Sequence, residues 1–160
     1  MKRTVISIAT AFALLIAMAM PCFASENSIE REYEYYDDGS YAIIETAIST
    51  PSDISSIGTH SSSSKRATRT YTYYGTTNKK EWDITLDATF EYTGTKATAT
   101  KSSVDYTIYV TGWSCSSKSA TKSGATAKAS GTFKYKTVTR SKAIGLKCSK
   151  SGVISHVDYD

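Results

Sequence analysis

The chain has 160 residues, three cysteines, two histidines and a formal net charge of +4. This length allows one domain with a modest core. The few cysteines and histidines exclude an ordinary four-ligand zinc site. The sequence also lacks a phosphate-binding glycine loop and a dinucleotide-binding fingerprint, so we expect no cofactor and no metal site.

The N-terminus is typical of a secretory signal peptide. A short basic start precedes an uncharged apolar run over 5–20, a proline ends that run, and small residues, Cys22 and Ala24, occupy the two positions that signal peptidase inspects. The sequence therefore predicts a signal peptide over 1–24, secretion, and no transmembrane anchor after cleavage. Two alternatives remain open. The first is an uncleaved membrane anchor, because the apolar run approaches the length of a spanning helix. The second is a lipoprotein attached at Cys22, although the preceding proline fits that signal poorly.

Charge is unevenly distributed after the predicted cleavage site. Residues 25–64 carry a formal charge of −7, whereas residues 65–160 carry +9. Segments of opposite charge attract each other in solution. The sequence thus predicts that the acidic segment docks on the basic one and masks it from anionic partners.

The first part of that acidic segment, 25–48, contains a predicted β-hairpin. Two alternating runs flank Asp37-Asp38-Gly39, and an Asp-Gly pair supplies the positive φ that tight hairpin turns need. An isolated hairpin is only marginally stable in water. A serine-rich stretch without an apolar period follows, which predicts a flexible linker over 49–67.

Residues 68–160 alternate apolar and polar side chains in several runs, which are separated by glycine-containing turns. The longest run is predicted to place six side chains in a core: Trp82, Ile84, Leu86, Ala88, Phe90 and Tyr92. The run over 125–135 places small residues inward, so a second sheet must approach closely there. No segment after Ala24 has a helical period. We expect an all-β antiparallel β-sandwich of immunoglobulin-like architecture.

Two cysteines, Cys115 and Cys148, remain after the predicted cleavage. A pair of cysteines in an exported chain is typical of one structural disulfide. In the chain-entropy model, closing a loop of about 34 residues stabilises a fold by roughly 4 kcal/mol. The sequence therefore predicts a Cys115–Cys148 disulfide.

A row of carboxylates on the longest run is a first candidate for chemistry: Glu81, Asp83, Asp87 and Glu91. Alternate residues of a strand lie about 6.6–6.8 Å apart, a spacing that inverting glycosidases also use for their two acids. A general acid needs burial to raise its pKa, and the polar face of this strand is predicted to be open to water. We therefore interpret the row as solvated partners of lysines on another strand, Lys128, Lys134 and Lys136.

The histidines offer little for catalysis. His60 lies in the serine-rich stretch and His156 in the C-terminal tail, and neither segment is predicted to be rigid enough for a nucleophilic triad. His156 with Asp158 and Asp160 makes at most a weak metal group. Asp37-Asp38-Gly39 lacks the downstream glutamate of a calcium loop.

The basic segment also carries tyrosines suited to stacking on bases or sugar rings: Tyr71, Tyr73, Tyr74 and Tyr109. Nucleic acid is not an expected partner of a secreted protein. Tyr109 is predicted to be exposed because it alternates with an apolar set on the opposite face. The expected partners are an anionic cell-wall polymer, a glycan or an envelope surface.

Four stretches resemble those of a family of small secreted proteins from Gram-positive bacteria whose function is uncharacterised. They are YYDDGSY at 35–41, WDITLDATFEYTGTKAT at 82–98, SKSATKSG at 117–124 and the segment from VTR to CSKSG at 138–152. The resemblance implies export and a β domain, and it brings no site residues. The leading hypothesis is a secreted, non-enzymatic module for binding or adhesion at the cell envelope. A secreted effector or antimicrobial is the alternative, and a glycan hydrolase using Glu81 and Asp83 ranks last.

Overall fold

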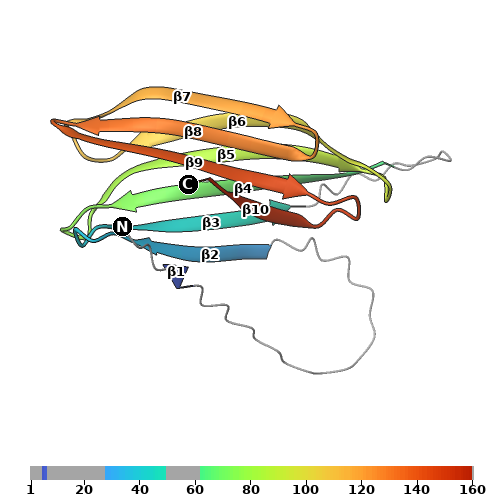
Figure 1. Cartoon of the computed structure of the whole chain (residues 1–160), viewed down its shortest axis with the longest axis horizontal. Coiled ribbons are helices and arrows are strands. Elements are labelled where there is room, and N and C mark those ends of the chain that lie inside the picture. The colour runs from blue at the N-terminus through green and yellow to red at the C-terminus, as the bar shows by residue number, and fades with distance from the viewer. Residues whose placement is uncertain (1–4, 7–27, 50–61, 160) are drawn as a thin grey trace, which may run out of the picture.

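The computed structural model describes residues 5–6, 28–49 and 62–159 (Figure 1). In these ranges the chain forms ten strands in two antiparallel sheets. The first sheet contains, in spatial order, β1 (Val5–Ile6), β2 (Ser28–Tyr35), β3 (Tyr41–Ser49), β4 (Ser63–Tyr74), β5 (Lys80–Tyr92) and β6 (Ala97–Ile108). The second contains β10 (Ile154–Asp158), β9 (Val138–Cys148), β8 (Thr126–Tyr135) and β7 (Trp113–Ser123). None of the described segments is a helix long and apolar enough to cross a membrane.

The two antiparallel sheets pack against each other as two layers around one core, which confirms the all-β class and the two-sheet part of the prediction (Figure 1). The predicted immunoglobulin-like arrangement is not reproduced in the strand order. Immunoglobulin domains interleave their strands between the sheets by Greek-key connections. Here each sheet is a meander of consecutive strands, and most of its connections are short turns, which join adjacent antiparallel strands. The hairpin between β2 and β3 is one example, and its Gly39 has the predicted positive φ of 83°.

The core lies between the sheets and is centred on β5. Five of the six residues that the alternation places inward, from Trp82 to Phe90, are at most 1% exposed, and Tyr92 is partly buried. Opposite them, β8 presents small residues, as its alternation predicts. A Cβ atom added to Gly131 would come within 2.8 Å of Ile84. The ring of Phe133 stacks on the indole of Trp82 at 3.9 Å between centroids and so joins the two layers.

The acidic hairpin belongs to the first sheet rather than standing apart from it. β3 pairs with β4 from Tyr41 opposite Tyr74 to Ser49 opposite Arg66. β4 begins at Ser63, so the last residues of the predicted linker are strand. The rest of that linker, 50–61, lies outside the described residues. Of the predicted signal peptide only β1 is described, and it pairs with Tyr33 and Glu34 of β2.

The predicted disulfide is not formed in this structure, because both cysteines are free thiols. Cys115 lies opposite Phe133 on β8, and Phe133 lies opposite Arg140 on β9. Cys148 is eight residues further along β9, which corresponds to roughly 26 Å of strand. A disulfide needs Cα atoms about 4.4–6.8 Å apart. The two thiols are therefore at opposite ends of the second sheet.

The separation of Cys115 and Cys148 predicts that both titrate as thiols and that stability does not depend on reductant. In the folded protein, half-buried Cys115 should react with a thiol reagent before buried Cys148, whose pKa is raised by burial. Mass spectrometry after alkylation, with and without denaturant, measures both sites. A melting temperature that falls when a reductant is added would contradict this arrangement.

Candidate functional site

The predicted carboxylate row lies on the outer face of the first sheet, but its partners are different from those expected. Asp87 pairs with Arg66 on β4 at 2.8 Å and with Lys101 on β6 at 3.4 Å. The hydrogen bond from Arg66 lowers the pKa of Asp87. The expected partners, Lys128, Lys134 and Lys136, lie on β8 and just after it in the other sheet. A strand's side chains reach neighbours in their own sheet first, and sequence alone does not name those neighbours.

Asp83 is not solvated as predicted, since it is only 7% exposed. Its Oδ1 accepts the backbone N–H of Thr107 at 3.1 Å and its Oδ2 accepts the hydroxyl of Tyr109 at 2.6 Å. Lys80 pairs with the same carboxylate at 3.0 Å. Glu81 occupies a β-bulge between Lys80 and Trp82, where the register with β4 shifts. Asp83 therefore holds the end of the β5–β6 ladder, and Glu81 is set apart from it by the bulge.

The tyrosines of the predicted stacking surface are divided between the two faces of the first sheet. Tyr71 and Tyr73 are buried between the layers. Tyr74 stacks on Tyr41 of the hairpin with centroids 4.8 Å apart. Tyr109 is 48% exposed, as predicted. These four tyrosines do not form one platform.

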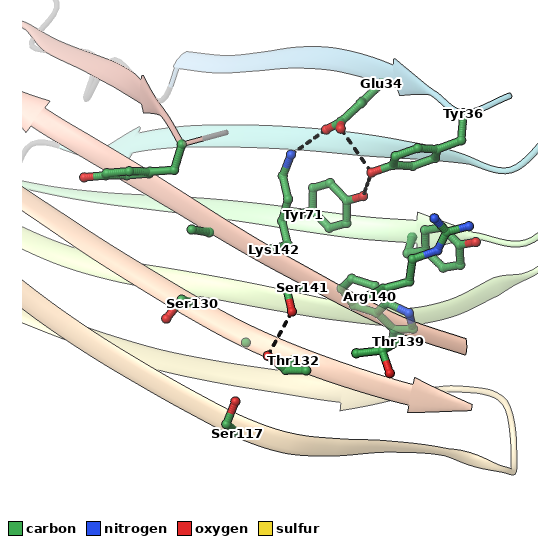
Figure 2. Close-up of a pocket in the computed structure, with 15 residues that line it drawn as sticks. Glu34, Tyr36, Tyr71, Ser117, Ser130, Thr132, Thr139, Arg140, Ser141 and Lys142 are labelled. Carbon is green, nitrogen blue, oxygen red and sulfur yellow. Dashed lines mark hydrogen bonds and ion pairs between the residues drawn. The ribbon is translucent and has the colours of Figure 1, made fainter. Parts of the chain in front are cut away.

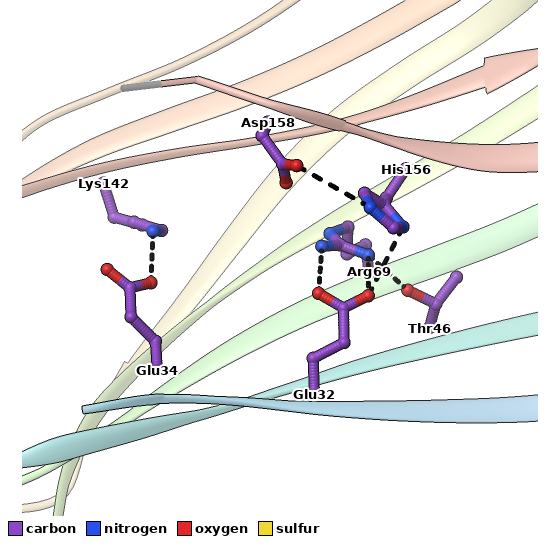
Figure 3. A network of polar contacts seen from close by, with 7 residues as sticks. All are labelled: Glu32, Glu34, Thr46, Arg69, Lys142, His156 and Asp158. Atoms are coloured by element: carbon purple, nitrogen blue, oxygen red, sulfur yellow. Dashed lines mark hydrogen bonds and ion pairs between the residues drawn. The ribbon is translucent and has the colours of Figure 1, made fainter. Parts of the chain in front are cut away.

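His156 lies on β10 and not in a solvated tail, because β10 pairs with β9 (Figure 3). Its Nδ1 is 3.4 Å from Glu32 and its Nε2 is 3.7 Å from Asp158. Ligand atoms of Glu30, Glu32 and His156 lie within 4.8 Å of one another. However, the guanidinium of Arg69 already pairs with Glu32 at 3.1 Å, which disfavours a second cation there. His60 and Asp160 lie outside the described residues.

A hollow of about 390 Å³ runs along β9, on the side that faces the first sheet (Figure 2). Its charged and aromatic lining comes from both layers: Glu34, Tyr36, Tyr71, Tyr73, Trp82, Arg140, Lys142 and Tyr159. Gly131 lines it with backbone only, because Ile84 and Phe133 fill the space that its Cβ atom would take. Ser130 and Thr132 also line it, but they alternate with buried Phe133, so their hydroxyls point away from the space between the sheets.

Local sequence explains how these charged residues reach the interior. On β9, Arg140 and Lys142 continue the phase of buried Ile144 and Leu146. On β2, which lies between β1 and β3 in the first sheet, Glu32 and Glu34 likewise alternate with outward-facing residues such as Tyr33. The acidic and basic strands thus meet across the hollow as the −7 and +9 segments predict.

Two ion pairs join the acidic hairpin to the residues of β9 that line the hollow. Lys142 reaches Glu34 at 2.6 Å (Figures 2 and 3). Arg140 reaches Asp38 of the hairpin turn at 2.5 Å. The guanidinium of Arg140 also lies over the rings of Tyr36 and Tyr73, at 5.3 and 5.7 Å from their centroids. The cations are therefore held by opposite charges and by aromatic faces together.

The carboxylate of Glu34 and the hydroxyls of Tyr36 and Tyr71 in the hollow are already engaged. Glu34 accepts the hydroxyl of Tyr36 at 3.1 Å through Oε1 and Lys142 through Oε2. The hydroxyl of Tyr36 is also paired with that of Tyr71. Burial raises the pKa of Tyr36 to about 12 and that of Tyr71 well above its usual range. Both phenols consequently remain protonated donors at neutral pH.

Donor atoms, in contrast, are left over. Among the described residues, three buried side-chain nitrogens lack a hydrogen-bond partner, and two of them, Trp82 Nε1 and Arg140 Nε, belong to residues that line the hollow. Trp82 is 1% exposed. A buried N–H without an acceptor costs about 1–3 kcal/mol. A ligand or an ordered water in the hollow would supply the missing acceptors.

Comparison with known proteins adds no assignment: no protein-family model, curated protein or solved structure matches the chain. The resemblance to a secreted Gram-positive family therefore stays a prediction. Sequence reasoning missed Glu34, Tyr36, Arg140 and Lys142 as site residues. Arg140 and Lys142 are detectable in the sequence, because these two cations are in phase with the apolar residues of the same strand.

Proposed function

We propose that this chain is an exported, non-enzymatic β-sandwich protein that binds an oxygen-rich polymer of the cell envelope, a glycan or an anionic wall polymer, in the hollow along β9. The predicted signal peptide supports export. The observation that carries the binding role is the pair of unpartnered donors, Trp82 Nε1 and Arg140 Nε, at one hollow. Aromatic walls joined to a few convergent polar groups are usual in ligand sites of this size.

The donors favour a ligand with many oxygen acceptors. Saccharide chains have hydroxyl and ring oxygens along their whole length, and their apolar faces pack on aromatic rings. Tyr36 and Tyr159 are the partly buried rings of the lining, whereas Tyr73 and Trp82 are buried and stack on each other at 5.2 Å. Each hydrogen bond that a ligand makes to a buried N–H relieves the cost of leaving that group unpaired.

Trp82→Phe tests this proposal, since it keeps an aromatic ring and removes one donor. Binding of solubilised wall polymers to the secreted protein, measured by calorimetry, should weaken about tenfold, which corresponds to one hydrogen bond of about 1.4 kcal/mol. Trp113→Phe is the matched control. Trp113 packs at 6.1 Å from Trp82 but does not line the hollow, so its replacement should leave affinity unchanged.

Two results would count against the proposal. The first is no retention of the protein at low salt on purified walls or envelope fractions. The second is equal weakening by both tryptophan variants. Growth inhibition of neighbouring bacteria by the pure protein, without wall binding, would instead support the secreted effector.

A further inference from the structure

The guanidinium of Arg140 is incompletely paired, as a comparison with Arg66 of the same chain shows. Arg66 on the outer face holds Asp87 with a fork, donating from Nε at 2.9 Å and from Nη2 at 2.8 Å. Arg140 contacts Asp38 through Nη2 at 2.5 Å, while its Nε is buried and, within the described residues, has no acceptor. The same edge of the guanidinium is thus half occupied at Arg140.

A half-occupied guanidinium edge matches one ligand chemistry. The Nε and Nη2 donors of arginine lie in one plane and fit the two oxygens of a carboxylate or phosphate. Hydrogen bonds between ionised partners are roughly twice as strong as neutral ones. A neutral hydroxyl would accept a hydrogen bond from only one of the two donors and would therefore bind less tightly.

We propose that the group recognised in the hollow is an oxyanion, a carboxylate or phosphate of the bound polymer, which completes the fork of Arg140 by displacing Asp38. Asp38 then acts as an intramolecular competitor. This inference rests on the proposed function and names the ligand chemistry of the same site.

The surroundings of Arg140 make such an exchange feasible. The side chain of Asp38 is 48% exposed, so its Oδ2 can exchange the contact with Arg140 for water without a large desolvation change. Ser40 holds Asp38 through its backbone N–H at 3.0 Å and through its hydroxyl, and these bonds persist without Arg140. Arg140 stays in position because the rings of Tyr36 and Tyr73 flank it.

Lys142 supplies a second cation two residues along the same face of β9. Its ammonium group carries three donors, and Glu34 takes one of them. Trp82 Nε1 adds a neutral donor in the same lining. An anionic group that reaches Arg140 therefore meets further donors in the same lining, while the carboxylate of Glu34 stays paired with Lys142.

The test compares three polymers at low salt with the full secreted chain: polygalacturonate for carboxylate, polyphosphate for phosphate, and dextran as the neutral polymer. Affinity for at least one anionic polymer should exceed that for dextran by about tenfold, a difference of about 1.4 kcal/mol. Whichever anionic polymer binds more tightly identifies the oxyanion.

Two variants separate the fork from general charge. Arg140→Lys keeps the positive charge and removes the fork, so affinity for the anionic polymer should fall about tenfold. Asp38→Asn removes the competitor, so affinity should rise severalfold. The matched control is Arg66→Lys, which alters a fork on the outer face and should leave binding unchanged. Thermal unfolding of each variant establishes that it is folded.

The inference is overturned if dextran binds as tightly as both anionic polymers, if Asp38→Asn weakens binding or leaves it unchanged, or if Arg66→Lys reduces it as much as Arg140→Lys. Dextran binding that depends on Trp82 would overturn the oxyanion and leave the proposed function standing. No binding of any of the three polymers, together with no retention on walls, would contradict both the oxyanion inference and the proposed function.

Discussion

Replacing Arg69 with Met is expected to lower the free energy of unfolding by about 3 kcal/mol. Arg69 is 2% exposed on the inward face of β4. Its guanidinium donates to Glu32 at 3.1 Å and to Thr46 at 2.8 Å (Figure 3). The substitution leaves the carboxylate of Glu32 half-buried without its main counter-charge, and removal of one partner from a buried pair is costly because the other stays desolvated.

A double variant distinguishes this cause from lost packing. Arg69→Met combined with Glu32→Gln removes both charges, so most of the lost stability should return. Urea unfolding of the single and double variants measures the difference. If the double variant is no more stable than the single one, the ion pair is not what makes Arg69 important.

Phe133→Ala is expected to lower the free energy of unfolding by about 3–5 kcal/mol. The Phe133 ring is fully buried and stacks on Trp82 across the layers, so its loss opens a cavity between the two sheets. Backbone pairing within each sheet should survive, because Phe133 contributes to packing and not to the ladder.

Val138→Ala provides the control for this core substitution. Val138 begins the next strand and is 42% exposed, so the change should stay within about 0.5 kcal/mol. Chemical unfolding with an unchanged denaturant slope would show that stability alone has altered. A loss below about 1 kcal/mol for Phe133→Ala would contradict the central place of the Trp82–Phe133 stack.

Local patterning was sufficient for much of the fold. The alternation from Trp82 to Phe90 correctly predicts a strand and its buried face, because successive strand residues point to opposite sides whatever the strand's neighbours are. The Asp-Gly pair correctly predicts the hairpin turn, because the positive φ at Gly39 is a local requirement. Both features depend on a few adjacent residues.

Pairing between distant residues was not available from patterning. The disulfide was expected because two cysteines in an exported chain usually pair, but the meander order places Cys115 and Cys148 at opposite ends of one sheet. Asp83 was expected to be solvated because it alternates with core residues. It is buried because the backbone of β6 and the side chain of Tyr109 close over it.

The candidate site shows the same division. The opposite charges of the hairpin and the following segment predict that they attract each other, and Asp38–Arg140 and Glu34–Lys142 are the contacts that they make. Which acid meets which base depends on strand order and on how the layers face each other. The unpaired Nε of Arg140 also depends on the strand order and on how the layers face each other.

The sequence by itself determined the all-β class, the inward residues of the long strands and the charge contrast between the two segments, because each follows from composition or from a period of two residues. Only the tertiary structure decided that the hairpin completes the first sheet, that the cysteines are apart and that unpaired donors converge beside β9. These features arise from contacts between strands far apart in the chain, and local periodicity carries no information about them.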